Sequence, residues 1–177
     1  MNTEQNYAKE QAIAKYSSIV GMLAAVDCDY DRLDELKEDQ AEMQREVDDS
    51  DGGNAAASSR LALWMSGDDG QELAQLIEDA GDCESQDDAS ERIQESPLSI
   101  EVRSGWANCG DALNAEEFQI LLCTGGPAVR ILGELDQHGQ PDRAWIEYQD
   151  WGTPWTQYFD ADGATLVRYA QQFYFGE

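Results

Sequence analysis

The sequence FQILLCTGGPAVRILGEL, residues 118–135, predicts two strands joined by a turn. Residues 118–123 are apolar on both faces, which is typical of a strand in the middle of a sheet. Residues 124–127 combine two glycines with a proline and turn the chain. Val129 and Ile131 then share one face of the returning strand. This pair of strands predicts the centre of an antiparallel sheet.

Further elements flank this central pair. Residues 98–102 alternate apolar and polar side chains, which predicts a half-buried strand before it. A turn at residues 137–142 leads into a fourth strand at 144–149. Residues 160–173 predict a closing helix, whose turn and N-cap lie at Asp160–Gly163.

Apolar residues at steps of three and four predict two helices before residue 50. The stripes are Ile13, Tyr16, Val20 and Leu23, and then Leu33, Leu36, Gln40, Met43 and Val47. They suggest an antiparallel helical hairpin joined at residues 27–29, although that joint could also continue one helix. The segment Asp48–Asn54 ends the second helix and is typical of a loop.

Shorter helices are predicted up to Pro97. A third helix covers residues 55–65, and Asp68 or Asp69 could cap the helix that follows it. A short helix at residues 89–94 ends before Pro97. The sequence therefore predicts an α+β fold in two parts. These are an acidic helical region at residues 1–97 and a module at residues 98–177, a three- to four-stranded antiparallel meander with a C-terminal helix.

Charge is the most unusual property of the composition. There are 37 Asp and Glu against 11 Lys and Arg, which gives a net charge of −26. Such a chain repels nucleic acid and anionic membranes and attracts basic surfaces. Residues 27–51 hold twelve acidic and three basic residues. A helix of that length spans about 38 Å, so its carboxylates recur about every 3 Å, close to the phosphate spacing of about 3.4 Å along a DNA strand.

A partner-binding surface is predicted on the outer side of the second helix. Its members are Asp31, Asp34, Glu35, Glu38, Glu42 and Asp49, joined by Asp68 and Asp69 at the start of a second acidic stretch. Like charges four residues apart disfavour this helix by roughly 1–2.5 kcal/mol in total. That cost favours a use for the charge, namely contact with the Lys and Arg of a partner.

Residues typical of catalysis are scarce. The one histidine, His138, falls in a predicted turn, and no phosphate-binding loop or nucleophile elbow occurs. The four cysteines have no short spacing between them, which favours reduced thiols over zinc ligands or a disulfide framework. We therefore expect a non-catalytic protein without cofactor or metal.

One acidic segment matches part of a metal-binding loop and also fits the start of a helix. Asp27, Asp29, Asp31 and Glu38 match liganding positions of a calcium-binding EF-hand loop. The sixth position of that loop requires glycine but holds Arg32. An acidic helix start is therefore the favoured interpretation.

The C-terminal half resembles a module of uncharacterised accessory proteins of bacterial plasmids, phages and integrative elements. The segments that carry the resemblance are Ser96–Ser99, Arg103–Trp106, Ile120–Pro127, Asp150–Trp155 and Phe173–Glu177. The resemblance implies accessory or counter-defence work and supplies no catalytic residue. The acidic character is similar to that of DNA-mimic anti-CRISPR and anti-restriction proteins.

Three interpretations remain open. The first is an inhibitor that presents carboxylates to the nucleic-acid-binding surface of a basic protein or complex. The second is an acidic surface adapted to high salt, with charge on all faces. The third is an adaptor that binds through the aromatic and apolar surface of residues 98–177 while the acids serve solubility. A start without a secretory signal and the lack of a long apolar run lead us to expect a cytoplasmic protein, and either helical stripe could serve a homodimer.

Overall fold

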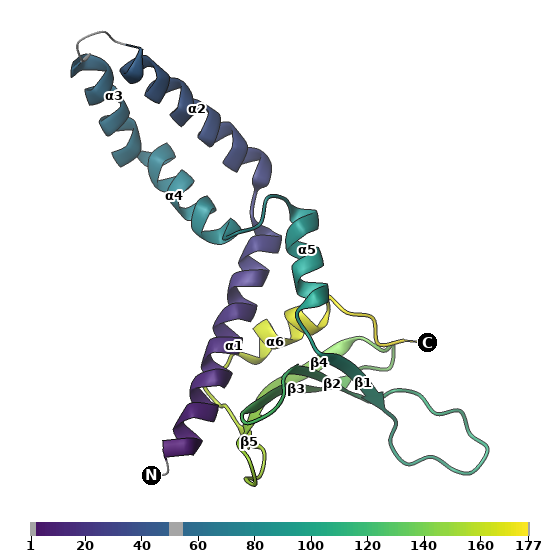
Figure 1. Ribbon diagram of the computed structural model, residues 1–177. Helices are drawn as coiled ribbons and strands as arrows, with labels where there is room; N and C mark the ends of the chain where they lie inside the picture. Colours follow the sequence, from purple (N-terminus) through teal and green to yellow (C-terminus); the bar gives the residue numbers. More distant parts are fainter. Residues whose placement is uncertain (1–2, 50–54, 177) are drawn as a thin grey trace. The chain divides into compact units, whose positions relative to one another are not determined.

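The structure, a computed structural model, describes residues 3–49 and 55–176 (Figure 1). Its elements are α1 (Thr3–Asp27), α2 (Tyr30–Asp48), α3 (Ala55–Ser66), α4 (Asp68–Ala80), α5 (Gln86–Glu95), β1 (Ser99–Arg103), β2 (Glu117–Cys123), β3 (Ala128–Leu135), β4 (Pro141–Gln149), β5 (Thr156–Gln157) and α6 (Gly163–Ala170). Helices come first, an antiparallel sheet follows and a helix closes the chain, so the predicted α+β class is confirmed. Within the described ranges, no helix combines the length and apolar character of a membrane span.

The chain divides into two compact units. The hairpin unit is Ala24–Ala89, and the sheet unit combines Met1–Leu23 with Ser90–Glu177. This division does not coincide with the boundary drawn from the sequence at residue 97, because most of α1 groups with the sheet.

The sheet unit is built on five strands in the order β1-β2-β3-β4-β5, with every neighbouring pair antiparallel. The predicted meander is therefore present, extended by the two-residue strand β5. One face of the sheet forms the core, where Ile120, Ile131 and Ile146 align across three strands and are fully buried. Helix α6 packs against β4 (Figure 1).

Gly133 makes room for an aromatic ring in this core. It pairs with Phe118 across β2 and β3, and a Cβ at Gly133 would lie 2.2 Å from the Phe118 ring. The Phe118 ring also packs 4.6 Å from that of Phe175. A glycine here lets the ring lie directly over the neighbouring strand.

Helix α1 buries a face that overlaps the predicted one only in part, since Leu23 is buried as predicted. Among its described side chains the buried ones are Ala8, Ala12, Ile19, Leu23 and Ala25, the last of which belongs to the hairpin unit. Ile13 and Val20, both on the predicted stripe, are 39% and 44% exposed. The prediction followed the large apolar residues, whereas alanines line much of the packed face. Tyr16 anchors that face, because its hydroxyl accepts a hydrogen bond from the Asp162 backbone N–H at 3.0 Å.

Strand β1 is the edge of the sheet and is largely exposed. Ile100 and Val102 are 37% and 48% exposed. The predicted strand is present, but its expected half-burial is wrong. Alternation identifies a pleated strand and does not say whether another layer covers it.

The start of α6 follows the prediction closely. Asp162 is the N-cap, and its carboxylate accepts a hydrogen bond from the Thr165 backbone N–H at 2.9 Å. These bonds to Thr165 lower the pKa of Asp162. The helix itself is shorter than predicted, ending at Ala170.

In the hairpin unit, α2 runs antiparallel to α3 and α4. Side-chain contacts join Arg32 to Glu72, Gln40 to Met65 and Glu46 to Arg60. Residues later in α2 therefore contact residues earlier in the second arm, as antiparallel helices do. The core contains Cys28, Leu33, Leu36, Leu73 and Ala80, flanked by Tyr30, Trp64 and Leu76. The predicted stripe of α2 is therefore confirmed, but the second arm of the hairpin is α3 with α4, not the first helix.

A glycine separates the two helices of that second arm. Gly67 is the N-cap of α4 and has an extended conformation, so Asp68 and Asp69 lie in the first turn. The prediction that one of these two aspartates caps the helix is therefore wrong. A Cβ at Gly70 would lie 2.4 Å from the Met65 carbonyl oxygen, so glycine permits the tight approach of the two helices. Residues 50–54 of the predicted loop lie outside the described residues.

Candidate functional site

Negative charge is concentrated in the hairpin unit. Its sequence holds 21 acidic and 4 basic residues, for a net charge of −17, whereas the sheet unit carries −9. Since the hairpin unit is also the smaller, its charge per residue is about threefold higher. Of the two units, the hairpin unit therefore attracts a basic partner more strongly.

The outer face of α2 carries a row of exposed carboxylates, here called the α2 ridge. Its members are Asp31, Asp34, Glu38, Glu42 and Asp49. At 100° per residue they lie opposite the buried Leu33 and Leu36. Within the described part of the chain, no ridge carboxylate forms an ion pair. All five were predicted as partner-binding residues, and the helix brings them to one side.

Arg45 lies on the same side and offsets one of the five ridge charges. Its Nε donates a hydrogen bond to the Ala41 carbonyl at 3.2 Å, which holds the base of the guanidinium against the helix backbone. The ridge therefore keeps a surplus of negative charge along its length.

Two other predicted residues, Glu35 and Asp69, are already engaged inside the chain. Arg32 reaches Glu35 at 2.8 Å, Asp69 at 3.1 Å and Glu72 at 2.9 Å. Hydrogen bonds to Glu72 and Glu35 raise the pKa of Arg32 above its ordinary value. This cluster joins α2 to α4, so part of the predicted surface serves the fold. Asp68, the last predicted residue, is exposed in the first turn of α4 and forms no ion pair among the described residues.

A groove between α2 and α3, here called the α2–α3 groove, adds apolar surface to the acidic hairpin. It has a volume of about 460 Å³ and is lined by Asp39, Glu42, Met43, Glu46, Ala57, Arg60, Leu63 and Trp64. Arg60 Nη2 lies 2.7 Å from a Glu46 carboxylate oxygen. Of the predicted site residues only Glu42 lines this groove.

Sequence reasoning missed the other groove residues. Asp39, Met43 and Glu46 recur at the i, i+4, i+7 spacing of one helical flank, as do Arg60 and Trp64 at i, i+4. The sequence shows this spacing, but only the folded structure shows that α3 is the helix that faces this flank of α2.

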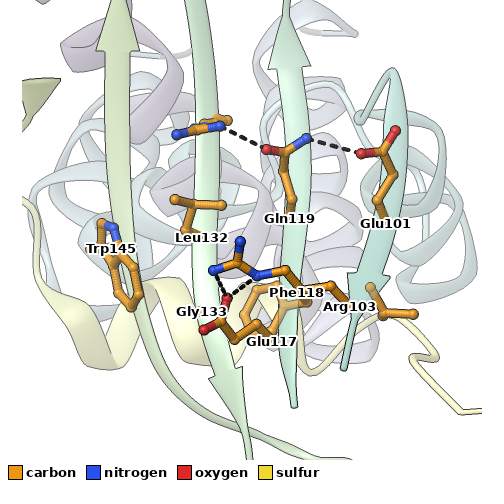
Figure 2. A pocket seen from close by; sticks show the side chains of 10 residues that line it. Glu101, Arg103, Glu117, Phe118, Gln119, Leu132, Gly133 and Trp145 are labelled. Carbon is orange, nitrogen blue, oxygen red and sulfur yellow. Dashed lines mark hydrogen bonds and ion pairs between the residues drawn. The ribbon is translucent and has the colours of Figure 1, made fainter. Parts of the chain in front are cut away.

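The open face of the sheet holds a second hollow, of about 300 Å³ (Figure 2). Figure 2 shows Arg103 paired with Glu117, and Gln119 bonded to Glu101, with Leu132 and Trp145 beside them. The charged and polar side chains of β1 and β2 in this hollow are therefore already paired with one another by an ion pair and hydrogen bonds.

Arg130 on the same face is also held within the fold. It lies 2.8 Å from Glu147 and stacks on the Trp155 ring, 4.0 Å from its centroid. Its Nη1 also donates to the Gln119 side-chain oxygen at 2.9 Å. These contacts leave Arg130 poorly placed to serve a phosphate group.

Other sequence candidates have structural roles. His138 lies exposed in the turn between β3 and β4, where its backbone N–H donates to Asp136 at 2.8 Å, as the turn prediction required. Helix α2 runs unbroken from Tyr30, and Asp29 caps it by accepting from the Arg32 backbone N–H at 3.0 Å. The helical interpretation of this acidic segment is therefore confirmed. The four cysteines, all within the described ranges, form no disulfide.

In residues 3–49 and 55–176, no three His, Cys, Asp or Glu side chains gather as a metal site. Comparison with protein-family models, curated proteins and solved structures gives no match. Function is therefore inferred from the charge and geometry of the chain itself.

Proposed function

We propose that the hairpin unit is a non-catalytic acidic decoy. It binds the basic, nucleic-acid-binding surface of a bacterial defence complex or DNA-binding protein in the cytoplasm, as an anti-CRISPR or anti-restriction DNA mimic would. The observation that carries the proposal is the α2 ridge, a row of carboxylates without an ion pair to any described residue, on the unit with net charge −17.

The spacing of charge along α2 supports mimicry of a phosphate chain. The helix has 19 residues, of which eight are acidic. It is therefore about 28 Å long and carries one carboxylate about every 3.6 Å along its axis, against about 3.4 Å for phosphates of one DNA strand. A surface that binds the phosphates of DNA through Lys and Arg would accept such a row.

The uneven distribution of charge argues against a surface adapted only to salt. Such a surface would carry similar charge on all parts, whereas the hairpin unit exceeds the sheet unit about threefold per residue. Like charges that lie close together oppose folding. A cluster of them is therefore better explained by contact with a basic partner than by adaptation to salt.

An adaptor function is the second candidate, supported by exposed aromatic residues in the sheet unit. Trp151 and Phe159 are each 79% exposed, and Trp106 is fully exposed. Aromatic side chains are enriched at the centres of protein interfaces. In this alternative the acids serve solubility and the sheet unit makes the contact.

Capture from bacterial lysate at low and high salt, with identification of the captured proteins, tests the decoy. Low salt should recover a basic nucleic-acid-associated partner, and high salt and excess DNA should release it. Recovery of partners without a basic nucleic-acid-binding surface would reject the decoy.

Two matched charge-reversal variants locate the contact. Asp34→Lys with Glu38→Lys reverses two ridge residues, and Glu116→Lys with Asp142→Lys makes the same charge change at exposed positions of the sheet unit. The ridge variant should lose capture while the control retains it. Equal loss would mean that only total charge matters, and retention by both would favour the adaptor.

A further inference from the structure

The α2–α3 groove differs from the ridge because it exposes apolar side chains between acidic ones. Leu63 is 74% exposed, and Met43 and Trp64 are half-buried beside it. An exposed leucine alone is ordinary, but here it adjoins a hollow of about 460 Å³ with further apolar walls. Such a surface favours an apolar side chain from a partner.

The rim of the groove defines the charge of that partner. Asp39, Glu42 and Glu46 follow one flank of α2, and Arg60 is the cation of the opposite wall. Arg60 is paired with Glu46, whereas Asp39 and Glu42 form no ion pair among the described residues. A bound segment with cations beside Asp39 and Glu42 is therefore favoured, and anionic segments are repelled.

The length of the groove suits two turns of helix. Asp39 and Glu46 are seven residues apart, which is about 10 Å along α2. A partner helix that lies in a groove between two helices buries apolar residues at positions i and i+4. The residues on the flank of the partner helix then lie next to the rim of the groove. The partner helix can therefore pack an apolar side chain in the groove while a Lys or Arg on its flank reaches the carboxylates of the rim.

We propose that the α2–α3 groove receives a basic amphipathic helix of the partner. Its apolar side chains pack against Met43, Leu63 and Trp64, and its Lys or Arg pair with Asp39 and Glu42. The inference rests on the proposed decoy function and names how that partner is held. A second copy of this chain is disfavoured as the occupant, because two chains of net charge −26 repel each other.

Arg60 provides an internal test of this arrangement. Its guanidinium competes with the partner for the rim, since it already lies against Glu46. Arg60→Gln removes one cation from the wall and breaks its ion pair with Glu46. The side chain is 66% exposed, so the hairpin should keep its fold.

The probe is a fluorescent peptide of about 14 residues with Leu at helical spacing and Lys at the other positions. Two control peptides accompany it, one of the same composition in scrambled order and one of lysines with equal charge. Binding to the full chain is followed by fluorescence anisotropy at low and high salt. The amphipathic peptide should bind the tightest of the three.

Variants then assign the binding to the groove. Leu63→Gln should weaken the amphipathic peptide by about fivefold to tenfold and leave the lysine peptide unchanged. Arg60→Gln should strengthen the amphipathic peptide by about threefold or more. Leu98→Gln, at a 61% exposed leucine of the sheet unit, is the matched control and should change nothing.

Equal binding of the ordered and scrambled peptides, insensitivity to Leu63→Gln, or no binding at low salt would each overturn the groove proposal. These outcomes are separate from the fate of the decoy. In one outcome, charge reversal of the ridge abolishes capture from lysate, but Leu63→Gln does not weaken binding of the amphipathic peptide. The decoy function would then be supported by charge alone, without the groove. Loss of peptide binding in Leu63→Gln without a basic partner in lysate would leave the groove and remove the decoy.

Discussion

The guanidinium of Arg32 on α2 lies 2.9 Å from the carboxylate of Glu72 on α4. The same group reaches Glu35 on its own helix and Asp69 one turn before Glu72. One cation thus bridges three carboxylates from both arms of the hairpin. It offsets the repulsion between the carboxylates that the two arms bring together here.

Replacing Arg32 by Gln should therefore destabilise the hairpin more than removing another cation of α2. Lys37→Gln is the matched control, because Lys37 is exposed and forms no ion pair among the described residues. Thermal unfolding followed by circular dichroism should show the lower midpoint for Arg32→Gln at low salt. The difference should shrink at high salt, where exposed ion pairs are screened. Equal midpoints for the two variants at low salt would contradict a bridging role.

Leu36 and Leu63 offer a second matched comparison within the hairpin. Leu36 is fully buried and Leu63 is 74% exposed. Leu36→Ala should lower the free energy of unfolding by about 2–5 kcal/mol through lost burial and a cavity. Leu63→Ala should change it by less than about 0.5 kcal/mol. Hydrogen exchange of α2 amides measures both, since it reports on this unit separately.

Two glycines should respond to alanine in opposite directions. In Gly133→Ala the new Cβ would lie 2.2 Å from the Phe118 ring and 2.3 Å from the Arg143 carbonyl oxygen, so the substitution should cost about 1–3 kcal/mol. Gly21 lies within α1 with no atom within 4 Å of a new Cβ. Gly21→Ala should stabilise by about 0.5–1 kcal/mol because alanine favours helix. Denaturant unfolding measures both, and a neutral Gly133→Ala would contradict the described packing.

Alkaline pH should weaken the hairpin through Tyr30. Desolvation raises the pKa of Tyr30 to about 12, and the nearby Cys83 and Cys28 thiols act in the same direction. The neutral hydroxyl is favoured in the folded state, so stability holds below the unfolded pKa of about 10 and falls as pH rises from there towards 12. Burial also raises the pKa of the Cys28 thiol, which adds a loss in the same direction.

Tyr30→Phe isolates this contribution. Its unfolding free energy should fall less steeply than that of the original chain between about pH 10 and 12, because phenylalanine has no proton to release. Parallel curves for the two proteins would show that the Tyr30 hydroxyl does not titrate differently on folding. Measurement by denaturant unfolding at several pH values settles the comparison.

Several local features were predictable because their causes are local. The α2 stripe of Leu33 and Leu36, the Asp162 N-cap and the His138 turn each depend on residues within a few positions. The face of α1 was predicted only in part, because Leu23 is buried whereas Ile13 and Val20 are exposed. Alanines such as Ala8 and Ala12 pack closely but give a weak apolar signal. Exposed Val102 shows the converse, since an apolar strand can lie at an uncovered edge.

The candidate site was predictable only in part for the same reason. Ridge residues such as Asp34 and Glu38 follow from the period of a single helix. The pairing of Asp69 with Arg32, and the meeting of Met43 with Leu63 in the groove, join residues far apart in sequence. Such contacts depend on which helix becomes the second arm of the hairpin.

The amino-acid sequence by itself determined the α+β class, the surplus of negative charge and the apolar side of α2. Only the tertiary structure decided that α2 pairs with α3 and α4, and that Arg32 neutralises part of the predicted surface while an apolar groove opens beside Leu63. The physical reason is that periodicity reports how one element divides between apolar and polar faces. The choice of neighbour depends on the fit of side chains across the whole fold, which no single segment contains.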